Sequence, residues 1–93
     1  MVTAIVLINV DHGHVNDVAD QLIGMDGIAE VYSVGGRFDL VAIIRVKTND
    51  DMADLVTNHM LALKNIKDTE TLLAFKAFSE FDLERMFSIG LDE

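Results

Sequence analysis

A short polar segment interrupts the apolar middle of this 93-residue chain. The segment GGRFD, residues 35–39, opens the apolar run that ends at Val46. The two glycines allow positive φ and let another group approach the backbone closely. Glycines are also common in ordinary turns, so they do not by themselves indicate a binding site. Asp39 is less ordinary, because a carboxylate on an apolar strand is unfavourable unless a donor satisfies it. The donor is expected to be either internal (Arg37, Arg45 or a backbone amide) or the ammonium group of a ligand.

Two hydroxyl groups recur in the segment DTET, residues 68–71. In a strand, Thr69 and Thr71 lie on the same face, since side chains alternate. Two neighbouring hydroxyls can bind a carboxylate. Threonine is also common in strands for purely steric reasons, so both interpretations stay open at this point.

The histidines could serve a metal or acid–base chemistry. Asp11, His12 and His14 form an oxygen-nitrogen-nitrogen set for a divalent cation, and His59 lies on a later helix, but no spacing fixes a further ligand. No nucleophile elbow, HExxH motif or paired carboxylate accompanies them. The chain contains no Cys, which excludes disulfides, thiolate metal sites and cysteine nucleophiles. The sequence therefore predicts a protein that is not an enzyme and needs no cofactor or metal.

Composition predicts one packed domain. The chain is 51% hydrophobic and 6% aromatic, with no Pro, and its length suits a single core. Its net charge of -9, from 7 Lys and Arg against 16 Asp and Glu, repels phosphate backbones, so we expect no direct binding of nucleic acid. The apolar run at residues 2–10 is too short to span a bilayer and has no basic leader, which predicts no membrane association and a cytoplasmic location.

Hydrophobic periodicity predicts six elements. In chain order these are a strand at residues 2–10, a helix at 14–23, strands at 28–34 and 37–46 joined by a tight Gly-Gly hairpin connection, a helix at 48–63 capped by its TNDD start, and a strand at 69–78. This order is that of an α+β, ferredoxin-like βαββαβ sandwich. Residues 1–78 form the expected domain. Residues 79–93 form a tail whose six large apolar residues predict docking, on its own subunit or on a neighbour.

The sheet is expected to need a second chain. Helices in this architecture cover one face, and the other face of a monomer should be polar. In the first and third strands, however, the side chains on both faces are apolar. One face carries Ile5, Leu7, Val41 and Ile43, and the other face carries the other apolar residues of these strands. If this face were exposed to water, several hundred Å² of apolar surface would remain unburied, at a cost of roughly 25 cal/mol per Å². We therefore predict a homodimer with the sheets face to face, a dimeric α+β barrel.

Taken in this order, these residues resemble the effector-binding RAM domain of Lrp/AsnC (feast/famine) transcriptional regulators, over about residues 2–78. The turn GMDGIAEVYSVGGRFDLV matches the G-x-[YF]-D element of the family at residues 36–39, and DTET aligns with the Thr-rich start of the last strand. By this resemblance the ligand-binding residues are Gly36, Arg37, Phe38, Asp39, Thr69 and Thr71.

The resemblance also implies how these residues act. Such domains dimerise through their sheets and form rings, typically octamers, with amino-acid effectors where dimers meet. Gly36 would let the effector approach the backbone, Asp39 would receive its ammonium group, and Phe38 would shape the pocket. Arg37 would tune selectivity, and the two threonines would complete the site from a neighbouring last strand.

The implied function is an amino-acid effector-binding and oligomerisation module acting in transcriptional regulation. Because the first expected strand begins near Val2, the resemblance is to the stand-alone type without a helix-turn-helix domain, with a full-length Lrp/AsnC regulator as a candidate partner. An alternative is a dimeric α+β barrel enzyme, such as a small monooxygenase or isomerase, that uses His12, His14 or His59 in a cavity. A second alternative is the related ACT-type amino-acid-binding domain, which has the same order of elements.

Overall fold

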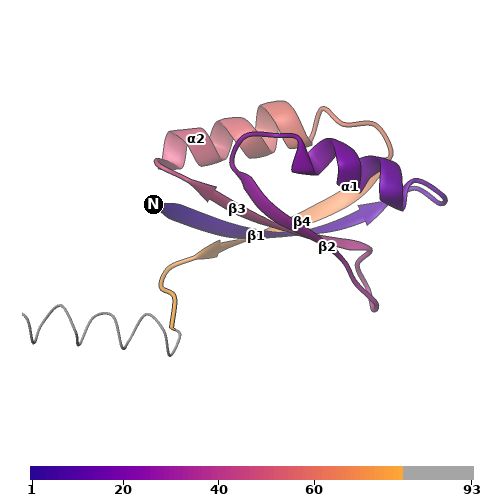
Figure 1. The fold of residues 1–93 in the computed structure, drawn as a ribbon, viewed down its shortest axis with the longest axis horizontal. Coiled ribbons are helices and arrows are strands. Elements are labelled where there is room, and N and C mark those ends of the chain that lie inside the picture. The colour runs from indigo at the N-terminus through magenta and orange to yellow at the C-terminus, as the bar shows by residue number, and fades with distance from the viewer. Residues whose placement is uncertain (79–93) are drawn as a thin grey trace, which may run out of the picture.

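One four-stranded antiparallel sheet, covered on one face by two helical segments, makes up the computed structural model, which describes residues 1–78 (Figure 1). The strands are β1 (Val2–Val10), β2 (Ile28–Ser33), β3 (Leu40–Val46) and β4 (Ile66–Ala74). The helical segments are α1 (Val15–Ile23) and α2 (Asn49–Asp54), and α2 continues as the π-helix η1 (Leu55–Met60). The sheet order β2-β3-β1-β4 and the element order confirm the predicted ferredoxin-like fold.

The second helical segment begins as predicted and continues differently. Thr48 has extended backbone angles, and its side-chain oxygen accepts a hydrogen bond from the amide of Asp51 at 3.0 Å, which caps α2. The hydrogen bonding then widens into the π-helix η1, which the periodicity did not predict. The wider turn lets Leu55 and Met60, five residues apart, both lie in the core.

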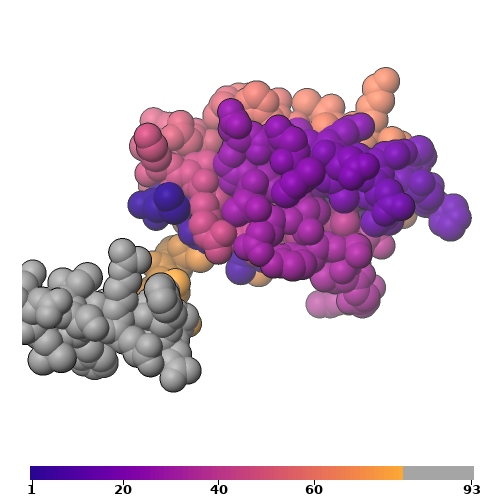
Figure 2. Space-filling view, in the orientation of Figure 1, coloured from indigo at the N-terminus to yellow at the C-terminus, as the bar shows by residue number. Residues whose placement is uncertain are grey.

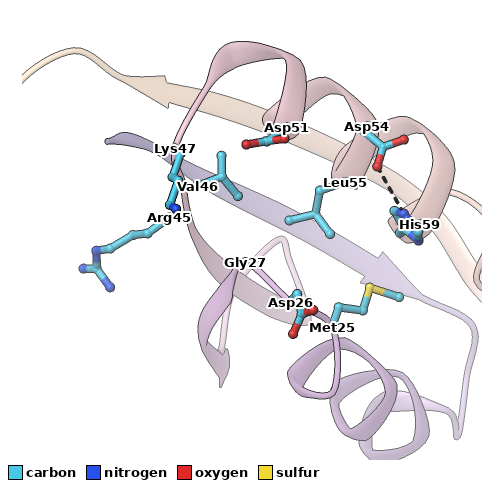
Figure 3. A pocket seen from close by; sticks show the side chains of 10 residues that line it. All are labelled: Met25, Asp26, Gly27, Arg45, Val46, Lys47, Asp51, Asp54, Leu55 and His59. Carbon is cyan, nitrogen blue, oxygen red and sulfur yellow. Dashed lines mark hydrogen bonds and ion pairs between the residues drawn. The ribbon is translucent and has the colours of Figure 1, made fainter.

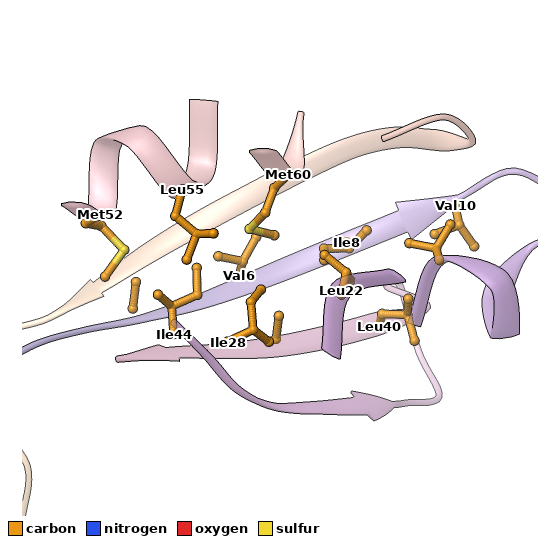
Figure 4. Packing of buried hydrophobic residues seen from close by; sticks show 13 residues of the cluster. Val6, Ile8, Val10, Leu22, Ile28, Leu40, Ile44, Met52, Leu55 and Met60 are labelled. Atoms are coloured by element: carbon orange, nitrogen blue, oxygen red, sulfur yellow. The ribbon is translucent and has the colours of Figure 1, made fainter. Parts of the chain in front are cut away.

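The core lies between the sheet and the helices (Figure 4). Its residues are Ala4, Val6, Ile8, Val10, Val18, Leu22, Ile28, Leu40, Ala42, Ile44, Met52, Leu55 and Met60. Every second residue of β1 belongs to this set, as the alternation of a strand requires. No polar or charged side chain of residues 1–78 is buried, so this core is held together by apolar packing alone.

The opposite face of the sheet, here called the open face, carries no helix from the described residues (Figure 1). At its centre Ile5 pairs with Ile43 and Leu7 pairs with Val41, and all four side chains are only half-buried. The register adds Leu72 of β4 opposite Ile5. The prediction that the two central strands are apolar on both faces is therefore confirmed.

The predicted bounds of two strands were wrong. The ladder between β2 and β3 ends where the Val34 amide donates to the Asp39 carbonyl at 3.0 Å, so the connection is a six-residue loop, residues 34–39, and β3 begins at Leu40. The last strand spans residues 66–74 instead of 69–78. It ends at Ala74, which pairs with Thr3 near the start of β1. The predicted docking of residues 79–93 lies outside the described residues.

None of the helices in residues 1–78 is long and apolar enough to cross a membrane.

Gly27 joins the end of α1 to the edge of the sheet, in a conformation that only glycine adopts readily. Its φ is +98°, and its carbonyl accepts from the Arg45 amide at 2.8 Å. A Cβ atom at this position would lie 2.8 Å from Cγ1 of Val46 and 3.0 Å from Cδ2 of Leu55. Both the backbone angle and the packing therefore require glycine.

Replacing Gly27 by alanine is expected to lower the free energy of unfolding by about 2–4 kcal/mol, through backbone strain together with overpacking. Gly13→Ala is the matched control, because Gly13 also has positive φ (+82°) but no atom lies within 4 Å of its added Cβ. The control should lose only about 1 kcal/mol. Urea unfolding of the two variants measures the difference, and equal losses would contradict the packing argument.

Candidate functional site

Asp39 is anchored to the end of the central strand. The amide of Val10 donates to Oδ2 of Asp39 at 2.9 Å, and the Asp39 amide donates to the carbonyl of Ile8 at 2.9 Å. The aspartate thus fastens the loop 34–39 to β1 through both its backbone and its half-buried side chain. Of the donors considered from the sequence, the internal one is a backbone amide, and neither Arg37 nor Arg45 contributes.

The carboxylate of Asp39 keeps unused hydrogen-bonding capacity. An ionised carboxylate offers about four lone-pair positions, and the Val10 amide occupies one of them on Oδ2. Within residues 1–78 no donor contacts Oδ1. A ligand ammonium group can therefore bind at Oδ1 while the bond that holds the loop stays intact.

The rest of the loop 34–39 is open to an approaching molecule. Gly36 has a φ of +116°, and no atom lies within 4 Å of the position that a Cβ would take. Arg37 is exposed and makes no ion pair with any described residue, whereas Phe38 is half-buried beside the anchored aspartate. The loop therefore offers open backbone, one cation and one aromatic ring within three residues of Asp39.

The two threonines lie on a different edge of the sheet. Thr69 pairs with Ile8 and Thr71 with Val6, so the two threonines share a face, as predicted, and that face is the helix side. In the order β2-β3-β1-β4, β1 separates them from β3, which places them roughly 10 Å across the sheet from the strand that Asp39 precedes. The six predicted ligand-binding residues therefore form two separate groups in one chain, residues 36–39 and the two threonines of β4.

A large hollow lies elsewhere, between α2, the turn before β2 and the end of β3 (Figure 3). It has a volume of about 520 Å³ and contains none of the six predicted residues. Val46 and Leu55 form its apolar floor, and the carboxylates of Asp26, Asp51 and Asp54 line its rim. No local motif predicted it, because three segments distant in the sequence supply its walls.

The ionisable groups with shifted pKa values are surface neighbours that satisfy one another. The Asn58 amide donates to Oδ1 of Asp54 at 2.7 Å and lowers the pKa of that carboxyl, with a smaller contribution from His59 at 3.2 Å. On the open face, the hydroxyl of Tyr32 donates to Glu30 and lowers the pKa of Glu30, while the same bond raises the pKa of Tyr32. These pairs explain the shifts without any catalytic centre.

The histidines do not converge. His12 is exposed in the loop before α1, His14 precedes α1 with Nδ1 3.6 Å from Oδ2 of Asp17, and His59 lies on η1. In the part of the chain that the structure describes, no three His, Asp or Glu side chains are close enough to hold a metal ion. The possible metal set at residues 11–14 is therefore not formed there.

Comparison with known proteins gives the family. The profile described as Lrp/AsnC ligand binding domain matches residues 3–83. TTHA0845 from Thermus thermophilus is 41% identical with a TM-score of 0.81, over 86% of this chain and all of that chain. FFRP-DM1 is 29% identical with a TM-score of 0.78, over 81% of this chain and all of that one.

The curated relatives are longer than this chain and are named as transcriptional regulators. The HTH-type transcriptional regulator FL11 of Pyrococcus furiosus is 28% identical over 79 residues, which are 85% of this chain and 52% of the relative, so the chain spans about half the length of the curated relatives that it matches. The complex of NMB0573 from Neisseria meningitidis with L-Met, at 10% identity and a TM-score of 0.76, shows a shared fold alone. With most of its length matched by the family profile and the whole sandwich shared with solved relatives, this chain belongs to the Lrp/AsnC ligand-binding domain family.

Proposed function

We propose that this protein is an amino-acid effector-binding and oligomerisation module that acts in transcriptional regulation. The observation that carries the proposal is Asp39, a half-buried carboxylate that is fixed on the Val10 amide and keeps Oδ1 free, beside the open backbone of Gly36. Family membership and the regulator FL11 support it, and NMB0573, which shares the fold, was crystallised as a complex with L-Met. The expected location of such a module is the cytoplasm.

The chemistry of an amino acid fits the two groups of residues. Its ammonium group would donate to Oδ1 of Asp39 in a charge-assisted hydrogen bond. Its carboxylate would accept from the hydroxyls of Thr69 and Thr71, and its side chain would contact Phe38 and Arg37. Because one chain holds these groups on opposite sides of β1, the proposed site combines the loop 34–39 of one subunit with the β4 threonines of another.

The proposed assembly starts from the open face. Its apolar centre would be covered by the same face of a second copy, in a twofold dimer where each patch contacts its equivalent. Dimers would then join into a ring, with an octamer as the expected size and a full-length Lrp/AsnC regulator as a further partner. An effector at the junction changes this assembly only if it binds the two assembly states with unequal affinity.

We favour this function over a dimeric α+β barrel enzyme. Such an enzyme needs polar groups that converge in a cavity of one subunit. His12 and His14 lie in the segment before α1, whereas His59 lies on η1 and is hydrogen-bonded to the carboxylate of Asp54. The large hollow contains only the last of the three, so the described histidines supply no shared centre.

The effector is expected to emerge from a thermal-shift screen of the common amino acids at millimolar concentration. At a hundredfold excess over its dissociation constant, a ligand stabilises by about 2.7 kcal/mol, and each kcal/mol moves the midpoint by roughly 4–8 °C. One or two amino acids should shift the midpoint of the unmodified protein. Asp39→Asn should abolish the shift, because it removes the charge that attracts the ammonium group.

Asp20→Asn is the control for this screen, because Asp20 is an exposed carboxylate on α1, away from the loop 34–39. It should keep the full response. A screen with no responding amino acid, or a response that survives in Asp39→Asn, would contradict the proposed effector site.

Asp39→Asn is used in the screen instead of Asp39→Ala because the two substitutions should differ in their effect on stability. Asp39→Ala leaves the Val10 amide without its side-chain acceptor and should lower the free energy of unfolding by about 1–3 kcal/mol. Asp39→Asn keeps an acceptor oxygen and should lose clearly less. Urea unfolding without any amino acid tests this, and two equal losses would show that the hydrogen bond to Val10 does not stabilise the fold.

If the open face forms the proposed dimer interface, a charge introduced at its centre should weaken the dimer. Leu7→Asp should raise the dimer dissociation constant by about a hundredfold or more, because an unpaired carboxylate buried in an interface costs about 3 kcal/mol. Ile23→Asp, which adds the same charge at a half-exposed position of α1, should leave the dimer unchanged. Sedimentation equilibrium measures both. A wild-type monomer at micromolar concentration would overturn the dimer.

A further inference from the structure

Near the end of β4, apolar side chains are exposed on both faces of the strand. No residue of β4 is buried, although the strand is paired with β1 over almost its whole length. Leu72 points to the open face and is 47% exposed, whereas Leu73 points to the helix side and is 48% exposed. The open face accounts for Leu72 if it binds a second copy, but it gives no cover to Leu73.

A second hollow explains the exposure of Leu73. The segment α2 packs mainly on β3 and β1, and a groove of about 370 Å³ separates α2 and η1 from β4. Met52, Ala53 and Val56 form its helical wall, and Thr71 and Leu73 form its strand wall. Among the described residues no charged side chain lines this β4 groove, so its chemistry suits an apolar occupant.

The chain itself supplies such an occupant. Residues 79–93 include six large apolar residues, namely Phe81, Leu83, Met86, Phe87, Ile89 and Leu91. Only four residues separate β4 from this segment, and two of them, Phe75 and Phe78, are 96% and 74% exposed. The last β4 residues form the lower left of the body, beside the N-terminal residues (Figure 2).

The connection is long enough for the segment to fold back on its own strand. An extended chain covers about 3.3–3.6 Å per residue, so Phe81 can lie up to roughly 25 Å from Ala74. The groove begins at Leu73 itself, next to the last residue of the strand. The family profile ends at residue 83, so most of the segment lies beyond what the family shares.

We propose that residues 79–93 dock into the β4 groove of their own chain and cover Leu73. The short connection favours the chain's own groove, because the effective concentration of a tethered segment is high. Docking needs no effector and is independent of the proposed function. Since Thr71 lines the groove, the docked segment would become a neighbour of the proposed effector site.

A single fluorescent reporter tests the docking, because the chain contains no Trp. In the full chain, Phe87→Trp should give blue-shifted emission and several-fold weaker quenching by acrylamide than the same substitution in a free peptide of residues 79–93. Adding Leu73→Asp should restore strong quenching. Emission and quenching equal to those of the free peptide would overturn the proposal.

Leu72→Asp is the matched control for Leu73→Asp, since the two leucines are adjacent, equally exposed and on opposite faces. It should leave the tryptophan protected even where it weakens the dimer. If Leu72→Asp exposes the tryptophan as fully as Leu73→Asp does, the segment binds the open face and the proposal is wrong. Far-UV circular dichroism checks that each variant is folded.

The absence of Cys allows a second measurement that separates a chain's own groove from a neighbour's. Ala53→Cys in the helical wall is combined with a cysteine at Leu83, Met86 or Phe87 in turn, and the protein is oxidised at a series of concentrations. We expect a disulfide within one chain, with a yield that is independent of concentration. Covalent dimers as the main product would overturn docking within the chain.

Discussion

The fold depends on the requirement that β1 be covered on both faces. This strand lies between β3 and β4, pairs with both, and is apolar on both alternating sets of side chains. The helices bury the set that includes Val6 and Ile8. The other set, which includes Ile5 and Leu7, is left half-buried in the described chain. Burial of this set at roughly 25 cal/mol per Å² is the main force available for association, so the fold and the proposed assembly share one strand.

The end of the same strand holds Asp39, the residue on which the proposed function rests. The Val10 amide fixes Asp39, and a hydrogen bond to a charged group typically contributes about 1.5–3 kcal/mol. A ligand bound to Oδ1 would share this carboxylate with β1. The position of the ligand and the end of β1 are then coupled through one side chain, and the side chains of β1 also form the centre of the open face. This arrangement would give the proposed effector binding a short physical route to the proposed assembly.

Periodicity and capping predicted the features that depend on single elements, such as the bounds of β1 and the Thr48 cap. They did not predict the start of β3 or the end of β4, because each depends on pairing with strands that are distant in the sequence. The same limit applies to the candidate site. A carboxylate beside an apolar strand predicts that Asp39 has a donor, but the sequence does not identify the Val10 amide, which lies 29 residues away. Thr69 and Thr71 share a face as predicted, but their separation from Asp39 depends on the strand order, and the large hollow has walls from three separate segments.

The edge strand β4 shows how one strand can serve two different contacts. Edge strands carry unpaired backbone groups and tend to associate, so their exposed side chains need specific partners. In β4 the partners must differ, because Leu72 and Leu73 point to opposite faces. A twofold dimer can cover only the open face, since the helices occupy the other side of the sheet. The helix side of β4 therefore needs a different occupant from the open face, and the proposed docking of residues 79–93, which four residues separate from β4, would supply it without any further molecule.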